Sequence, residues 1–156
     1  VSPLFKVISP SMVDVVRLME SRGTVIGLDS LVGSSYALVA AGAVRDRGGI
    51  HVFVMEDRDG AGYLYNDLTP FLDPDRLLFF PTAYKRSIQF HQEDPSGMVQ
   101  RTTALNAIRT FTEGYLVLCT YPEALVECVV GMKRLRESIL TVRVGIPFRL
   151  RRSKRP

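Results

Sequence analysis

Residues 115–125 read YLVLCTYPEAL, and this stretch decides the fold class of the chain. Its first six residues are apolar, aromatic or β-branched, which is typical of a strand that is buried on both faces. Pro122 comes one residue later, and proline is favoured in the first turn of a helix. A buried strand that leads directly into a helix is the repeating unit of proteins with a parallel sheet.

The same order of strand and helix extends over most of the chain. The predicted strands are residues 24–28, 50–55, 77–80 and 115–120. The predicted helices, from apolar residues at helical spacing, are residues 12–19, 34–47, 61–72, 98–108 and 122–129. No hairpin signal such as Asn-Gly joins neighbouring strands. We therefore expect an α/β fold with a parallel sheet and helices on both of its faces.

Length and composition fit one soluble domain. The chain has 156 residues, of which 46% are hydrophobic and 23% charged, and this length is enough to bury a single core. No apolar run approaches the roughly 20 residues that cross a bilayer, and no secretory signal opens the chain. The two cysteines, Cys119 and Cys128, lie in apolar surroundings. We expect buried, reduced thiols in a cytoplasmic protein that does not bind membranes.

The positive charge of the chain is concentrated at its end. Five basic residues fall within the last eight positions: Arg149, Arg151, Arg152, Lys154 and Arg155. Subtracting these five charges from the net charge of +4 leaves −1 for the remaining residues. A near-neutral body lacks the basic surface that nucleic acids require. Any binding of DNA by this chain is therefore expected to come from the tail, for which the alternative is a plain solvated terminus.

The first predicted turn from strand to helix is where a parallel sheet would bind phosphate. A P-loop reads G-x-x-x-x-G-K-[ST], in which lysine meets the phosphates and the hydroxyl holds magnesium. Here Tyr36 stands in place of the lysine and Ala37 in place of the hydroxyl residue. The degenerate P-loop comprises Ser30, Gly33, Ser34, Ser35, Tyr36 and Ala37. It predicts a tight packing turn with no nucleotide, no cofactor and no hydrolysis.

Other clusters of polar residues favour structural roles. Residues 56–59, Glu-Asp-Arg-Asp, come after a predicted strand, where α/β enzymes often bind ligands, but acids also suit the start of a helix. Glu123 is expected in a first helical turn, although it lies one turn from Glu127. The two histidines, His51 and His91, are far from both cysteines in the sequence, so no metal site is predicted.

Residues 81–97 show no clear period and predict a long surface loop. The loop carries aromatic and basic residues, the types that most often anchor interfaces. The candidate interaction residues are Tyr84, Lys85, Arg86 and Phe90. A loop that merely covers the core is the alternative.

An ordered set of short motifs resembles a known family. The motifs are GL at 27–28, VGSSYAL at 32–38, DGAGYLYNDL at 59–68, LFFP at 78–81, QRTTAL at 100–105 and TYPEAL at 120–125. Together they resemble the N-terminal domain of the bacterial transcription-repair coupling factor, Mfd, from about Gly23 to Val130. The family extends to the excision-repair protein UvrB, whose equivalent domain keeps a working P-loop.

The resemblance implies a fold like the first domain of UvrB, that is, P-loop NTPase-like. It also implies a place at the start of an ATP-driven DNA translocase that displaces stalled RNA polymerase and recruits UvrA for excision repair. The motor domains of that protein lie outside this chain. The expected partners are UvrA and other domains of the same protein, with RNA polymerase and DNA bound through the absent domains.

The chain departs from the family at two places. UvrB carries a tyrosine-rich hairpin that enters damaged DNA, whereas residues 81–97 hold only Tyr84 and Phe90 as large aromatics. Residues 139–145 resemble the strand that leads into the next family domain, but the basic residues after Gly145 do not resemble the polar or acidic helix that the family has there. We therefore expect one UvrB-like domain over residues 1–138, then the connecting strand and a basic tail over residues 139–156.

The sequence is compatible with three functions. The favoured one is a non-catalytic interaction module of a transcription-repair coupling factor. The first alternative is a nucleotide-binding domain that keeps weak ATP affinity through Gly33 and the helix start. The second is a DNA-binding module that uses the tail together with Lys85 and Arg86.

Overall fold

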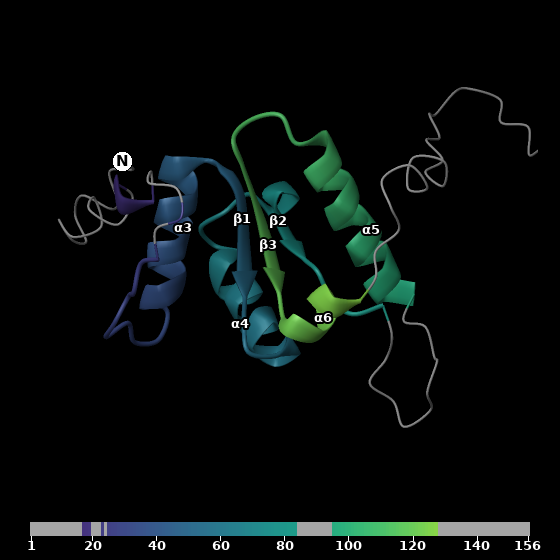
Figure 1. Cartoon of the computed structure of the whole chain (residues 1–156), viewed down its shortest axis with the longest axis horizontal. Coiled ribbons are helices and arrows are strands. Elements are labelled where there is room, and N and C mark those ends of the chain that lie inside the picture. Colours follow the sequence, from purple (N-terminus) through teal and green to yellow (C-terminus); the bar gives the residue numbers. More distant parts are fainter. Residues whose placement is uncertain (1–16, 20–22, 24, 84–94, 128–156) are drawn as a thin grey trace, which may run out of the picture.

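The computed structural model describes residues 17–19, 23, 25–83 and 95–127. Its elements, drawn in Figure 1, run in the order α3 (Ser35–Arg47), β1 (Gly49–Val54), α4 (Arg58–Leu68), the short 3-10 helix η1 (Pro74–Arg76), β2 (Leu77–Phe79), α5 (Pro95–Thr110), β3 (Tyr115–Thr120) and α6 (Pro122–Val126). The fold is therefore α/β over the described part of the chain.

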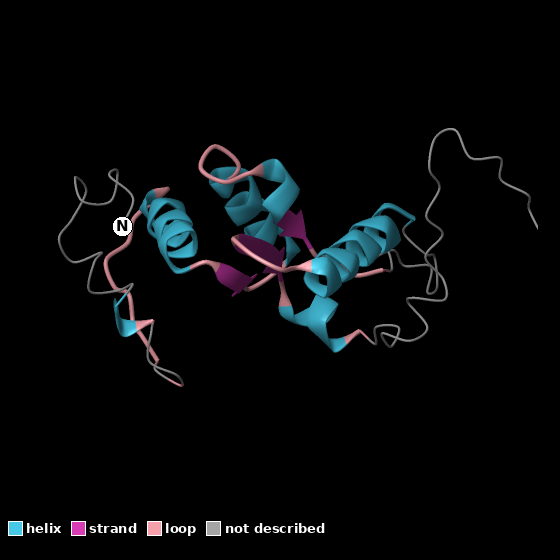
Figure 2. Cartoon of the chain, turned by 90° about the horizontal axis from the view of Figure 1, so that it is seen from above, coloured by secondary structure: helices cyan, strands magenta, loops and turns pink. Residues whose placement is uncertain are grey.

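The strands form a parallel sheet in the order β1-β3-β2. Val52 lies opposite Leu118, and Leu78 lies opposite Leu118 on the other side of β3. The chain passes from β1 to β2 through α4 on one face, and from β2 back to β3 through α5 on the other face (Figures 1 and 2). Both crossovers are right-handed, the hand that nearly all such connections adopt.

The two faces of the sheet bury two separate cores. On one face, α3 and α4 pack their small and branched residues over Val117 and Cys119 of β3. On the opposite face, α5 and α6 place Ala104 and Ala124 against Leu116 and Leu118. Helices thus cover both faces, as Figure 2 shows from above, and the expected layer arrangement is confirmed.

Most predicted elements are confirmed with small shifts at their ends. The strand over residues 115–120 has the bounds that the sequence predicts. The strand predicted at 50–55 spans Gly49–Val54, and the one predicted at 77–80 spans Leu77–Phe79. The helix predicted at 34–47 begins one residue later, at Ser35.

The strand predicted at residues 24–28 is wrong for the residues described there. Residues 25–28 form no strand, and Val25 is 96% exposed. An isolated run of apolar residues becomes a strand only beside a partner, and no described strand pairs with the outer edge of β1. Gly27 within the run weakens it further, because glycine has no side chain to pack.

Three details of the predicted helices and loops need correction. Met98 on α5 is 44% exposed, whereas Gly97, Arg101 and Ala104 are its buried residues. Leu105 and Ile108 pack against the core as predicted, whereas in the first turns of α5 the buried position belongs to Arg101 and not to Met98. The loop predicted at 81–97 ends earlier, since α5 begins at Pro95. Leu72, predicted on the helix of residues 61–72, is buried just beyond the end of α4.

Several predictions fall partly or wholly outside the described residues. Of the helix predicted at 12–19, the structure describes only Arg17, Leu18 and Met19, and the first two are helical. Cys128, the boundary at residue 138 and the basic tail lie outside the described part. No helix among the described residues is both long and apolar enough to cross a membrane.

Candidate functional site

The loop before α3 lies at the edge of the sheet where phosphate sites occur. Because only Gly48 separates α3 from β1, the helix runs antiparallel to that strand, and its first turn lies at the carboxyl ends of the strands (Figure 1). The loop is turned by two residues of positive φ, Ser30 at 62° and Gly33 at 58°. The hydroxyl and backbone N–H of Ser35 both donate to the carbonyl oxygen of Val32.

The two substituted positions of this loop serve packing. Ala37 is buried in the core of the α3 face, with Ala40 and Val44. The side chain at this position therefore faces the sheet, away from any ligand in the loop. Tyr36 is half-buried and lines an apolar cavity beside β1 together with Phe53. Partial burial raises the pKa of Tyr36, and the nearby Cys119 raises it further. A phenol is neutral or negative in its two protonation states, so Tyr36 cannot replace the positive charge of a P-loop lysine.

Ser34 occupies the N-cap position of α3, but its side chain makes no capping hydrogen bond. A Cβ added at position 33 would meet no atom within 4 Å. Glycine is therefore not needed there to make room for a neighbouring group. The turn is formed by backbone geometry at Ser30 and Gly33. Ser30, Gly33 and Ser34 form a loop, and Ser35, Tyr36 and Ala37 begin α3, with no charged group among these six residues. Because residues 25–28 form no strand, the predicted turn from strand to helix is not found here, and the comparison with a P-loop stays a prediction.

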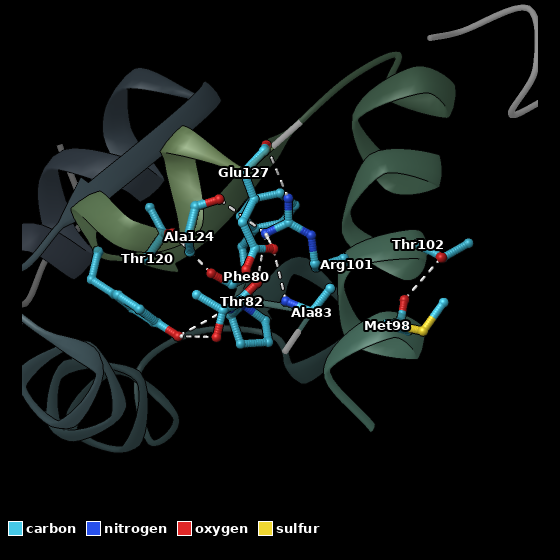
Figure 3. Close-up of polar contacts among 11 residues, drawn as sticks. Phe80, Thr82, Ala83, Met98, Arg101, Thr102, Thr120, Ala124 and Glu127 are labelled. Carbon is cyan, nitrogen blue, oxygen red and sulfur yellow. Dashed lines mark hydrogen bonds and ion pairs between the residues drawn. The ribbon is translucent and has the colours of Figure 1, made fainter. Parts of the chain in front are cut away.

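A second site, absent from the sequence prediction, lies where β2 ends. Arg101 on α5 is 6% exposed, and its Nη1 donates to the carbonyl oxygens of Pro81, at 2.7 Å, and Ala124, at 2.9 Å. Nη1 also lies 3.4 Å from Oε2 of Glu127. The guanidinium stacks 4.3 Å from the centre of the Phe80 ring. We refer to these five residues as the Arg101 cluster (Figure 3).

Three further bonds tie the chain just after β2 to the same region. The backbone N–H of Ala83 donates to Oε2 of Glu127 at 2.8 Å. The backbone N–H of Thr82 donates to the Tyr121 hydroxyl at 3.0 Å, and the Thr120 hydroxyl donates to the carbonyl oxygen of Phe80 at 2.8 Å. Figure 3 shows these contacts converging on residues 80–83. The last described residues before position 84 are thus held by side chains from β3, from α5 and from Tyr121 and Glu127, which flank α6.

The candidate interaction residues Tyr84, Lys85, Arg86 and Phe90 lie outside the described residues. Their flanks do not, since residues 80–83 precede them and α5 begins after them at Pro95. The sequence pairs Glu127 only with Glu123, whereas in the structure Glu127 binds Arg101. An arginine beside apolar residues on a helix could have signalled the cluster, but its carbonyl partners are distant in sequence.

The acidic residues after β1 form a helix start, as the sequence favoured. Asp57 is the N-cap of α4, and its Oδ1 accepts from the backbone N–H of Gly60 at 2.8 Å. Asp59 lies in the first turn, where a negative charge complements the helix dipole. Among the described residues, no three His, Cys, Asp or Glu side chains gather as a metal site would require.

Comparison of the chain with known protein families, with curated proteins and with solved structures finds no match. The family resemblance carried by the sequence motifs therefore stays a prediction.

Proposed function

We propose that this chain is a non-catalytic interaction module, and that it forms the N-terminal, UvrB-like part of a transcription-repair coupling factor. The observation that carries the proposal is the Arg101 cluster, which holds the base of the segment at residues 84–94. The helix-start loop, in contrast, presents no lysine and no magnesium ligand. The module is assigned a P-loop NTPase-like fold whose phosphate loop has become a packing turn.

The energetics of the Arg101 cluster support a role in presenting residues 84–94. A buried guanidinium is stable only when its donors are satisfied, and here they are satisfied mainly by backbone carbonyl oxygens of Pro81 and Ala124. Bonds of this kind fix the path of the main chain. Binding residues are often carried on a loop whose ends a rigid scaffold positions. Tyr84, Lys85, Arg86 and Phe90 are of the residue types that most often anchor interfaces.

The proposed partners are UvrA and other domains of the same protein, with RNA polymerase and DNA engaged through domains outside this chain. The decisive experiment captures purified UvrA on the immobilised chain. Replacing Lys85 and Arg86 together by alanine should reduce capture. Replacing Arg45 and Arg47 by alanine is the matched control, since it removes two positive charges from exposed positions in the last turn of α3.

A thermal melt of each variant establishes that it is folded before capture is compared. Equal capture by the parent, the Lys85/Arg86 variant and the control would remove the segment from the interface. If the parent itself captured no UvrA, the same variants would be compared for docking onto the motor domains in the full-length protein. Failure of both assays would overturn the interaction role.

The non-catalytic half of the proposal is tested by calorimetric titration with ATP and magnesium. We expect no dissociation constant below about 10 micromolar, which corresponds to roughly 7 kcal/mol of binding. Tighter binding would instead support the alternative of a nucleotide-binding domain. The helix start alone gives an anion only generic attraction through its free N–H groups.

A further inference from the structure

Within the part of the chain that the structure describes, no strand pairs with the outer edge of β1. β1 lies at the end of the strand order, with β3 on its inner side. On the face shared with α5 and α6, its side chains Ile50, Val52 and Val54 are 43%, 52% and 51% exposed. Three apolar side chains in a row on one face of an unpaired edge strand are an aggregation hazard that folded proteins normally cover.

The opposite side of the same edge is hollow. A cavity of about 250 Å³ lies between α3 and β1, with walls that include Leu28, Tyr36, Val39 and Phe53. Its position is the one that a further strand would occupy, beside β1 and beneath α3. Among the described residues, no strand occupies the place that the cavity, the exposed strip and the outer edge of β1 border.

The backbone of β1 shows which groups are unpaired at this edge. Gly49 and Met55 donate their N–H groups to Gly114 and Thr120, on the inner side. Along a parallel strand, alternate residues direct their N–H and C=O groups to the same side. The N–H groups of Ile50, Val52 and Val54 therefore point outward, to the vacant side.

Topology indicates which segment belongs there. After β3 the chain enters α6, which lies on the same face as α5 (Figures 1 and 2). The α5 crossover shows that a right-handed connection on this face moves from β2 toward β1. The next strand must therefore lie on the β1 side of β3, and because β1 already fills the adjacent position, the first vacant one is the outer edge of β1.

The sequence after α6 contains a segment that is suited to form a strand and lies far enough from β3 for a parallel crossover. Residues 139–144 read ILTVRV, rich in the β-branched residues that favour strands. Residues 121–138 separate them from β3, more than the roughly dozen that a parallel crossover needs. Strand alternation would direct Leu140, Val142 and Val144 to one side and Ile139, Thr141 and Arg143 to the other. The first side is wholly apolar and suits the cavity under α3, whereas the second side is mixed and suits the opposite face.

We propose that residues 128–145 complete the sheet within the same chain. Residues 139–144 pair in parallel with the outer edge of β1, and their apolar side fills the cavity beneath α3. The preceding residues cross over Ile50, Val52 and Val54 and cover them.

Amide hydrogen exchange on the full chain tests this docking residue by residue. The amides of Ile50, Val52 and Val54 should exchange slowly in the parent. Val142→Pro, which breaks strand pairing, should speed their exchange by at least about tenfold. The amides of His51 and Phe53, which face β3, should stay protected, and Ser153→Pro in the tail is the matched control.

Two results would overturn the proposal. The first is fast exchange of these three amides in the parent, which would leave the edge open. The second is faster exchange of the three amides in Ile26→Pro but not in Val142→Pro, which would show that residues 24–28, and not residues 139–144, pair with the outer edge of β1.

If Val142→Pro unfolds the whole chain, disulfide formation replaces it as the measurement. With Cys128 changed to serine, Val52→Cys should form an intramolecular disulfide with Thr141→Cys or Arg143→Cys, which lie on the same side of the pleat. No disulfide in either pair, whether or not Val52→Cys bonds to Ile26→Cys, would also overturn the assignment.

Discussion

Among the described residues, Arg101 is the one charged residue that is buried, with 6% of its surface exposed. Its donors satisfy carbonyl oxygens that would otherwise lie unpaired in the interior. Removing one partner lowers the free energy of unfolding by more than the hydrogen bond itself contributes, because the remaining partners stay buried without a hydrogen bond. At the scale of single residues, this side chain therefore contributes more to the site than any group in the helix-start loop.

The first prediction concerns this side chain. Arg101→Ala should lower the free energy of unfolding by about 2–4 kcal/mol, measured by urea denaturation. The free energy of unfolding of Arg101→Lys should lie between those of Arg101→Ala and the parent, because lysine keeps the charge but lacks the planar fork of donors. Thr102→Ala, which removes a hydroxyl bonded only to the neighbouring Met98 carbonyl, should change stability by less than about 0.5 kcal/mol. Equal stability of Arg101→Ala and Thr102→Ala would contradict the role of the cluster.

A second prediction concerns Cys119, which is buried near the end of β3. Burial raises the pKa of this thiol from 9.0 to about 12, because the interior disfavours the thiolate. In a Cys128→Ala background, a thiol reagent at pH 8 should react with Cys119 at least about a hundredfold more slowly in the folded chain than in urea. Similar rates in the two states would show that the thiol is accessible.

The same pKa shift has a defined effect on stability. The raised value favours the protonated thiol of the folded chain, so this contribution is complete below the unfolded-state pKa near 9 and is lost as the pH rises toward about 12. The free energy of unfolding should therefore fall between pH 9 and pH 11, and it should fall less steeply in a Cys119→Ala variant.

At the scale of elements, the end residues decide where helices begin. Asp57 caps α4 through its bond to Gly60, whereas Ser34 makes no such bond at the start of α3. The third prediction is that Asp57→Ala lowers the free energy of unfolding by about 1 kcal/mol, while Ser34→Ala changes it by only a few tenths. Urea denaturation followed by circular dichroism measures both. If Ser34→Ala lowered the free energy of unfolding more than Asp57→Ala did, Ser34 and not Asp57 would be the stabilising helix cap.

The elements also show how far sequence reasoning reaches. The bounds of β3 were predictable because all six of its residues are apolar, β-branched or aromatic and five of them are buried. Residues 25–28 have a similar composition but no strand, because pairing depends on what lies beside a segment and composition does not show that. The burial of Arg101 on α5 was equally hidden, because the sequence does not show the carbonyl oxygens that an arginine at a core position binds.

At the scale of the whole molecule, the degenerate loop was predictable because it depends on residue identity at consecutive positions. The Arg101 cluster was not, since it joins residues 20 to 26 positions apart through backbone atoms that carry no sequence signal. The family, the proposed partners and the boundary at residue 138 stay predictions.

The fourth prediction concerns the distribution of charge over the molecule. The full chain should bind duplex DNA weakly, and the variant lacking residues 146–156 should bind negligibly, because five basic residues lie in that tail. Affinity of the full chain should fall steeply with salt, with a logarithmic slope no steeper than about −4.5 for five phosphate contacts. Fluorescence anisotropy at several salt concentrations measures this. Unchanged affinity after truncation would place the binding surface in the body.

The placement of the Arg101 cluster has a consequence for how this molecule can change over time. Phe80, Pro81 and Ala83 are bound by Thr120 of β3, Arg101 of α5 and Glu127, just after α6. We therefore expect the fold to depend on these contacts more than on the residue types at positions 84–94. Substitutions, insertions or a grafted peptide in that interval should be tolerated by the fold, whereas changes at Arg101 or Glu127 should not. Under the proposed function, recognition and folding would be encoded by separate sets of positions, so that one could diverge while the other is kept.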